Sequence, residues 1–230
     1  MNIDFSMIWF AIIIFATLMY IIADGFDLGI GIILPFTRDK IQRDTMINSV
    51  APVWDGNETW LVLGGAALFG AFPLAYSVIL DALAMPLTIM LVALIFRGVA
   101  FEFRFKADDT HKVFWDNAFI VGSLLTTFMQ GIVVGSVVQG LPIIDRTFAG
   151  SYFDWLSPFA LVIAYSLLGC GWLIMKTQGH LQQSLYKVIL PLTFVMLAVI
   201  AVVSLWTPLA QPAIAERWFS LPNIFFFLPV

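Results

Sequence analysis

The sequence has little charge, a single cysteine and only two histidines. Charged residues make up 11% of its 230 residues, with 11 Lys and Arg against 15 Asp and Glu, for a formal net charge of -4. The negative net charge comes from scattered acids, and we expect no nucleic-acid partner. The lone Cys170 excludes an intrachain disulfide, and its apolar surroundings in the sequence indicate a small packing residue.

We expect both histidines, His111 and His180, to fall in cytoplasmic loops, beside Lys112 and Gln182, and no helix to contain a histidine. Haem in a membrane bundle is usually held by a histidine that projects from a helix. Zinc, copper and iron–sulfur sites need sets of Cys, His or carboxylate ligands. We therefore expect no metal site in this chain and no cofactor bound by it alone.

Long apolar stretches are abundant instead. Hydrophobic residues make up 61% of the chain, and its mean hydropathy is +0.96. Because an α-helix satisfies its own backbone in lipid and crosses it in about 20 residues, these stretches predict an all-α, polytopic transmembrane helix bundle. We expect one membrane-embedded domain over residues 1–230, with six helices plus a truncated seventh that opens at "IFFFLPV". The six predicted spans are about 7–35, 51–73, 76–97, 115–139, 157–175 and 188–207.

Basic residues indicate the orientation, because Lys and Arg in short loops stay on the cytoplasmic side. The loops after the first, third and fifth predicted spans are basic, which places the N-terminus outside. The first span lacks a basic leader and a small-residue cleavage site, so we expect it to be retained. The predicted cytoplasmic residues are Arg38, Lys40, Arg43, Arg104, Lys106, Lys112, Lys176 and Lys187, and the opposite side has Arg146 and Arg217.

Four acids lie within the predicted spans, where polar residues are costly and tend to mark function. Asp24 and Asp27 of "ADGFDLGIG" are three residues apart, which places both on one helix face. Asp55 and Glu58 of "APVWDGNETWL" repeat this spacing. All four fall in the cytoplasmic half of the membrane, at a similar depth, and we expect them to form one cluster. Its predicted neighbours are Trp54, Asn57 and Trp60.

The stretch "LIFRGVAFEFR" ends the third predicted span and places Arg97 and Glu102 at the same depth. An arginine there can pair with a carboxylate and keep it ionised. A row of carboxyls can pass protons along, as a path from the cytoplasm to a buried reaction site requires. The alternative is that the acids only hold helices in register through interhelical hydrogen bonds.

Small residues and end-of-helix acids have simpler interpretations. Gly25 and Gly29, like Gly131 and Gly135, have the GxxxG spacing that lets helices approach closely, so we expect a packing role. Acids near predicted helix ends are interpreted as caps or solvated groups. These acids are Asp81, Asp116 and Asp154.

Three motifs, in order, resemble subunit II of the cytochrome bd family of quinol oxidases, including its cyanide-insensitive relatives. They are "ADGFDLGIG", "MINSVAPVWDGNETWLVLGGAALFGAFP" and "FRGVAFEFR". The resemblance is close over the first three predicted spans. It continues more loosely through "SPFALV" and "GCGWLIMKTQG".

The resemblance implies a heterodimer in the bacterial inner membrane. The partner, subunit I, would bind the haems, either b and d or b alone, and oxidise quinol at the outer face while oxygen is reduced to water. Subunit II would be a haem-free partner, surrounded by membrane lipid, that contributes to proton uptake from the cytoplasm. The resemblance also allows a structural quinone in this chain and a small accessory subunit. Subunit II of that family has eight helices, so we expect this chain to be C-terminally truncated relative to it.

By motif, the resemblance gives proton-conduction candidates in "DGFD" and "WDGN": Asp24, Asp27 and Asp55. It gives supporting roles to Trp54, Asn57 and Glu58, and lets Arg97 tune the charge of the acids.

Two other functions stay open. A proton-coupled secondary transporter would also carry intramembrane carboxyls, but it predicts an inverted repeat and discontinuous helices, which this sequence does not show. A purely structural subunit would use the acids to bind helices together.

Overall fold

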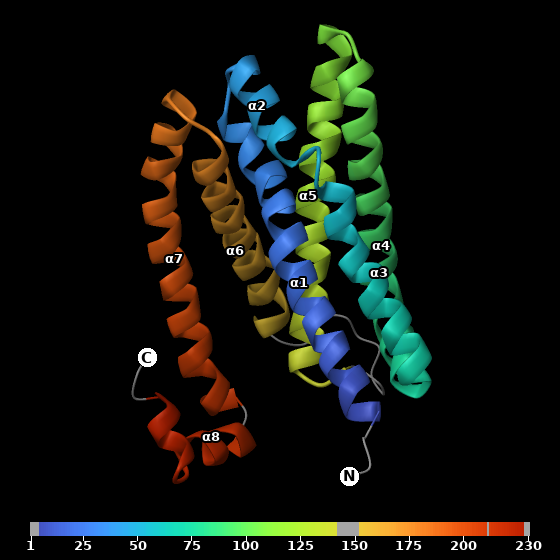
Figure 1. The fold of residues 1–230 in the computed structure, drawn as a ribbon. Helices are drawn as coiled ribbons and strands as arrows, with labels where there is room; N and C mark the ends of the chain where they lie inside the picture. Colours follow the sequence, from blue (N-terminus) through green and yellow to red (C-terminus); the bar gives the residue numbers. More distant parts are fainter. Residues whose placement is uncertain (1–4, 142–151, 211, 228–230) are drawn as a thin grey trace.

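The computed structural model describes residues 5–141, 152–210 and 212–227, and every secondary-structure element in these ranges is a helix. The predicted all-α class is confirmed. The long helices lie side by side as a bundle, with the short α2 at one end and α8 at the other (Figure 1). The elements are α1 Phe5–Ile33, η1 Leu34–Phe36, α2 Lys40–Val50, α3 Trp54–Ala71, α4 Pro73–Lys106, α5 Asp109–Val138, α6 Tyr152–Lys176, α7 His180–Ala210, α8 Pro212–Phe219 and η2 Asn223–Phe227.

Five described helices are long and apolar enough to cross a membrane, so the predicted count of six plus a seventh is not confirmed. The predicted span 51–73 corresponds to α3, which has 18 residues and begins with the polar run "WDGNE". That run lowers the mean hydropathy of the helix. The expected seventh span coincides with the five-residue η2 and with residues 228–230, which lie outside the described part.

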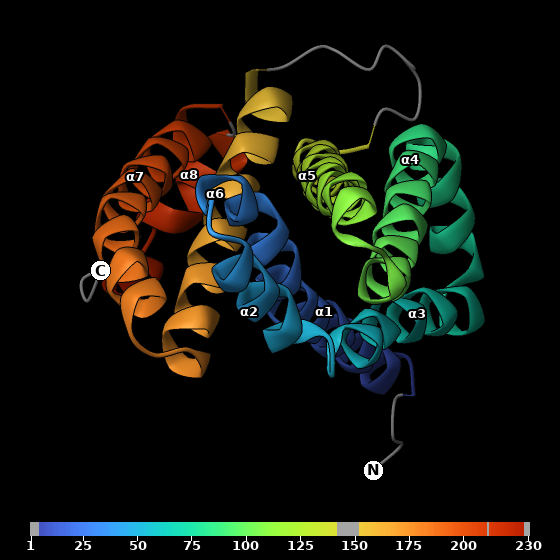
Figure 2. The ribbon, with the colours of Figure 1, turned by 90° about the horizontal axis from the view of Figure 1, so that it is seen from above.

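Helix α1 is central in the bundle and packs against α3, α5 and α6, as the view from above shows (Figure 2). Its C-terminal half is buried, from Ala23 to Ile33 with few exceptions, whereas most of its N-terminal half is exposed. Glycines allow this burial. A Cβ added to Gly29 would overlap the backbone carbonyl of Tyr165 on α6, and one on Gly25 would touch the Tyr165 ring.

The second predicted glycine pair lies on α5. A Cβ on Gly131 would overlap the backbone of Pro158 on α6, and Gly135 is buried. Glycine thus permits close backbone approach at two α6 contacts, one with α1 and one with α5.

Helix α2 lies in the segment between the first two predicted spans, where a loop was expected. Asp39 caps its N-terminus, because its carboxylate accepts hydrogen bonds from the backbone N–H groups of Ile41 and Gln42 at 2.8 and 3.3 Å. Met46, Ile47 and Val50, which share one helix face, are buried in the main apolar core. The 11-residue helix is too short and too polar to register as an apolar span, although its cap and its periodicity are both visible in the sequence.

Helix α4 is kinked at Leu83, where the backbone dihedrals are φ -115° and ψ 18°. Pro86, three residues later, accounts for the kink because it cannot donate the helical hydrogen bond and its ring clashes with the preceding turn. Beyond the kink, α4 packs against α5, where a Cβ on Gly122 would be 3.0 Å from the Ala93 carbonyl oxygen. This contact sets the position of the Arg97 segment.

The basic residues predicted to be cytoplasmic belong to one end of the bundle, where α1 and α6 end, α4 meets α5, and α7 begins. Arg217 is on α8, at the opposite end, and Arg146 lies outside the described residues. The main core cluster contains residues of α2 and of the last turns of α1, so it lies toward the basic end.

Candidate functional site

A fully buried arginine is the centre of the polar interior. The side chain of Arg97 on α4 has an exposed fraction of 0%. Its Nη1 donates hydrogen bonds to Asp24 Oδ1 at 3.0 Å and to Glu58 Oε1 at 2.6 Å. Its Nη2 lies 3.8 Å from Asp27 Oδ2. Three carboxyls from two helices therefore surround one guanidinium from a third.

The site forms because α3 presents two consecutive polar residues, one to α4 and one to α1. Glu58 reaches Arg97, while Asn57 Nδ2 donates to Asp27 Oδ2 at 2.9 Å and to the carbonyl of Ala23 at 3.3 Å. The three-residue spacing on α1 brings Asp24 and Asp27 to the same face. Each charged group of α1 thus has a partner on α3 or α4.

Aromatic rings enclose the guanidinium on another side. The Cζ of Arg97 lies 5.7 Å from the ring centroid of Phe101 and 5.9 Å from that of Phe119, within the range of cation–π attraction. Trp54, at the start of α3, stacks on Phe101 with centroids 5.2 Å apart and also faces Gly98. Trp54 therefore holds the start of α3 against α4 beside the cluster.

The remaining sequence-predicted residues lie outside the ion-pair network. Asp55 and Glu102 are exposed, and neither has an ion pair or side-chain hydrogen bond to the described part of the chain. Asp55 is one turn before Glu58 on α3 and within its electrostatic range. Trp60 packs edge-on against Phe15 of α1, with ring centroids 5.7 Å apart.

The comparison with known families decides the class of the protein. The model of the family described as cytochrome bd terminal oxidase subunit II matches residues 5–230.

This chain belongs to that family.

Curated proteins similar to this chain are also described as subunit 2 of an oxidase. The "Probable cytochrome oxidase subunit 2" of Haemophilus influenzae is 37% identical over 188 residues, which is 76% of this chain and 50% of the relative. The "Cytochrome bd-I ubiquinol oxidase subunit 2" of Escherichia coli K12 is 33% identical over 76% of this chain and 49% of its own length. The "Cytochrome bd ubiquinol oxidase subunit 2" of Bacillus subtilis is 33% identical over 78% of this chain and 56% of its own length. The chain spans about half the length of these curated relatives.

Both histidines of this family member were predicted to lie in loops, but His111 belongs to the first turn of α5 and His180 to the first turn of α7. The Nδ1 of His111 lies 2.6 Å from the carboxylate of Asp108, and the His111 side chain is 74% exposed. His180 contacts Gln42 at the basic end of the bundle. Among the described residues, no group of three His, Cys, Asp or Glu side chains has an arrangement that could hold a metal ion.

Sequence reasoning missed a polar extension of the site in this bd-family chain. Tyr20, one turn before Asp24 on α1, lies beside that carboxyl, and its hydroxyl accepts a 2.5 Å hydrogen bond from Gln130 Nε2 on α5. Gln130 belongs to a buried polar face of α5 that also contains Ser123, Thr126 and Thr127. Their i, i+3, i+4, i+7 spacing was the available signal.

A second polar network lies nearer the basic end of the bundle. Asp116, interpreted from the sequence as a cap or a solvated group, is instead buried and ion-paired to Arg43 and Arg104. The interpretation was wrong because α5 begins at Asp109 rather than near residue 115, which places Asp116 about two turns inside the helix. Asp154, predicted in the same way, has a side chain outside the described set.

Proposed function

We propose that this chain, joined to a haem-bearing subunit I, takes part in a quinol oxidase that reduces oxygen to water. In that complex it would be the haem-free subunit, and Asp24, Asp27, Asp55 and Glu58 would take up protons from the cytoplasm. The family membership and the named ubiquinol oxidase relatives support the complex. The haems of the partner would supply the electron transfer and the oxygen chemistry.

The observation that carries the proton-uptake role is the charge imbalance around Arg97. Three carboxyls share one guanidinium, so the cluster would carry two excess negative charges if every acid were ionised. A buried excess charge is costly because protein cannot solvate it as water does. The cluster is therefore suited to hold protons that move when the charge around it changes.

The exposure of the acids gives the path a direction. The side chain of Glu58 is 23% exposed, whereas those of Asp24 and Asp27 are at most 1% exposed. Asp55 is exposed one turn earlier on α3. Protons would enter at Asp55 and Glu58, pass to the Arg97 cluster, and continue toward Tyr20 and the polar face of α5.

The orientation follows the basic residues. The end of the bundle that contains α2 and the α4–α5 connection has most of the Lys and Arg, so it would face the cytoplasm with the N-terminus outside.

The test is turnover per haem in the full-length complex. Asp27→Asn and Glu58→Gln keep side-chain shape but cannot exchange a proton, and Asp55→Asn does the same at the proposed entrance. We expect each to slow quinol-dependent oxygen consumption at unchanged haem content. Glu216→Gln, an exposed acid on α8, is the matched control and should retain wild-type turnover.

The structural alternative predicts a different result. If the acids only bind helices together, the same variants would lower the yield of assembled complex while turnover per haem stays at the wild-type level. Asp27→Glu separates the two further, because it restores a titratable group and would restore turnover only if proton transfer matters.

A further inference from the structure

A basic cavity of about 310 Å³ lies at the end of the bundle, between α2, α4 and α5. Five cationic side chains line it, together with the carboxylates of Asp44 and Asp116. Five cations against two carboxylates leave three excess positive charges. The five cations are Arg38, Lys40, Arg43, Arg104 and Lys112.

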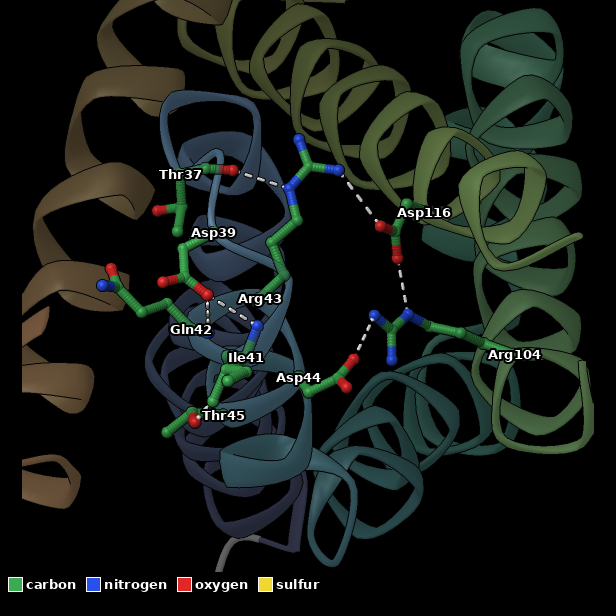
Figure 3. A network of polar contacts seen from close by, with 9 residues as sticks. All are labelled: Thr37, Asp39, Ile41, Gln42, Arg43, Asp44, Thr45, Arg104 and Asp116. Carbon is green, nitrogen blue, oxygen red and sulfur yellow. Dashed lines mark hydrogen bonds and ion pairs between the residues drawn. The ribbon is translucent and has the colours of Figure 1, made fainter. Parts of the chain in front are cut away.

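Ion pairs fix two of these cations in place, as the close-up shows (Figure 3). Asp116 bridges both guanidinium groups, since its Oδ2 lies 3.1 Å from Arg43 Nη1 and its Oδ1 lies 2.5 Å from Arg104 Nε. Asp44 accepts a hydrogen bond from Arg104 Nη2 at 2.6 Å, and the carbonyl of Thr37 accepts one from Arg43 Nε at 2.6 Å. The donors are therefore ordered before any ligand arrives, which lowers the entropic cost of binding.

These bonds leave donors available to an anion. Within the described part of the chain, neither Arg43 Nη2 nor Arg104 Nη1 has a hydrogen-bond partner. Arg38 and Lys40 are exposed and form no ion pair with a described residue. A phosphate group matches such a set because several oxygens can accept from guanidinium forks and an ammonium at once.

The surroundings of the cavity favour a lipid as the source of the phosphate. Arg104 lies near the end of the membrane-length helix Pro73–Lys106, where headgroups meet water. Val113 lines the cavity and is 53% exposed, so an apolar side chain borders the same space as the cations. Apolar groups beside clustered cations can accommodate acyl chains together with a headgroup.

We propose that this cavity binds the phosphate group of an anionic phospholipid headgroup. The site stands apart from the Arg97 cluster and does not depend on the proton path. Bound lipid would connect α2 to the α4–α5 connection at the membrane surface.

The test uses the full-length complex, stripped of lipid in detergent, and native mass spectrometry. The probes are dihexanoyl-phosphatidylglycerol, the zwitterionic dihexanoyl-phosphatidylcholine and inorganic phosphate. The variant pair Arg38→Ala/Lys40→Ala removes two cations of the cavity that have no described ion pair. The control pair Lys106→Ala/Lys187→Ala removes two exposed cations of the same end that do not line it.

Phosphatidylglycerol should bind more tightly than either other probe, and the cavity variant should raise its Kd about tenfold or more. The control pair should leave the Kd within about twofold, since distant charges are screened by salt. Asp44→Asn, which removes a negative charge from the cavity but keeps an oxygen that can accept from Arg104 Nη2, should tighten binding. An unchanged Kd in the cavity variant would overturn the proposal. Phosphate that binds as tightly as phosphatidylglycerol would overturn the lipid assignment and indicate a site for soluble phosphate.

Discussion

Replacement of Arg97 by glutamine tests how the buried cluster is held together. The side chain has no exposure and makes ion pairs of 3.0 and 2.6 Å with Asp24 and Glu58, and a looser one of 3.8 Å with Asp27. Removal of one partner from a buried ion pair costs about 3–5 kcal/mol, because the remaining charge is left without compensation. We expect Arg97→Gln to lower the free energy of unfolding by an amount in this range.

The exposure of the acids predicts which second change rescues the variant. Asp24 is 1% exposed and cannot be solvated, whereas Glu58 is 23% exposed and can reach water more readily. Asp24→Asn in the Arg97→Gln background should therefore recover more stability than Glu58→Gln in the same background. Lys106→Gln, at an exposed position of the same helix, is the control and should change stability by less than about 0.5 kcal/mol.

The assay is unfolding of the full-length complex in mixed detergent micelles, with a double-mutant cycle for each acid. Two results would refute the reasoning. One is a loss below about 1 kcal/mol for Arg97→Gln, far short of the cost of an uncompensated buried charge. The other is strict additivity between Arg97→Gln and Asp24→Asn, which would mean that the two groups do not interact.

Three further predictions concern packing, capping and pH. Gly29→Ala should destabilise the complex by about 1–3 kcal/mol in the same unfolding assay, because an added Cβ overlaps the backbone of α6. Gly65→Ala is the control and should be close to neutral, because an added Cβ there meets no neighbouring atom within 4 Å. Equal effects of the two substitutions would contradict the packing of α1 against α6. Asp39→Ala should cost about 1 kcal/mol and speed hydrogen exchange over residues 40–50, and unchanged exchange there would argue against the cap. Asp108 caps the N-terminus of α5. The hydrogen bond from the backbone N–H of His111, and to a lesser extent the one from its imidazole, lower the pKa of Asp108 below 3.8. The cap is therefore intact above pH 3.8 and is lost as the pH falls through the lower pKa of the folded state. Exchange at the start of α5, corrected for intrinsic rates, should therefore rise only in strong acid, and Asp108→Asn should abolish that dependence; a rise already near neutral pH would show that another group is responsible.

The sequence could predict the depth of the acidic residues but not all of their partners. Helical spacing places Asp24 and Asp27 on one face, and span positions bring Glu58 and Arg97 to the same level. Nothing in the spacing distinguishes Asp55 from Glu58, because both lie one turn apart on the same side of α3. Only the packing of α3 against α4 selects Glu58 for Arg97 and leaves Asp55 exposed.

The polar network of Figure 3 could not be predicted from the sequence, because it also depends on how distant helices pack. Asp116 pairs with residues 73 and 12 positions earlier in the chain, and a single sequence gives no sign of such long-range contacts. The short α2, which carries Arg43 and Asp44, was predicted to be a loop because its 11 residues are too few and too polar for a membrane span. The cap and the apolar periodicity of α2 are visible in the sequence, but its ion pairs with Asp116 of α5 and Arg104 of α4 are not.

The most direct test of the proposed proton path is proton uptake by the full-length complex after an oxygen pulse, followed with a pH dye in weak buffer. For Glu58→Gln, the account predicts uptake slowed by about 100-fold, a typical loss when a proton-transfer group is removed, with the haem spectrum unchanged. Glu216→Gln should match the wild type. Uptake at the wild-type rate in Glu58→Gln, with intact haems, would contradict the claim that this cluster conducts protons.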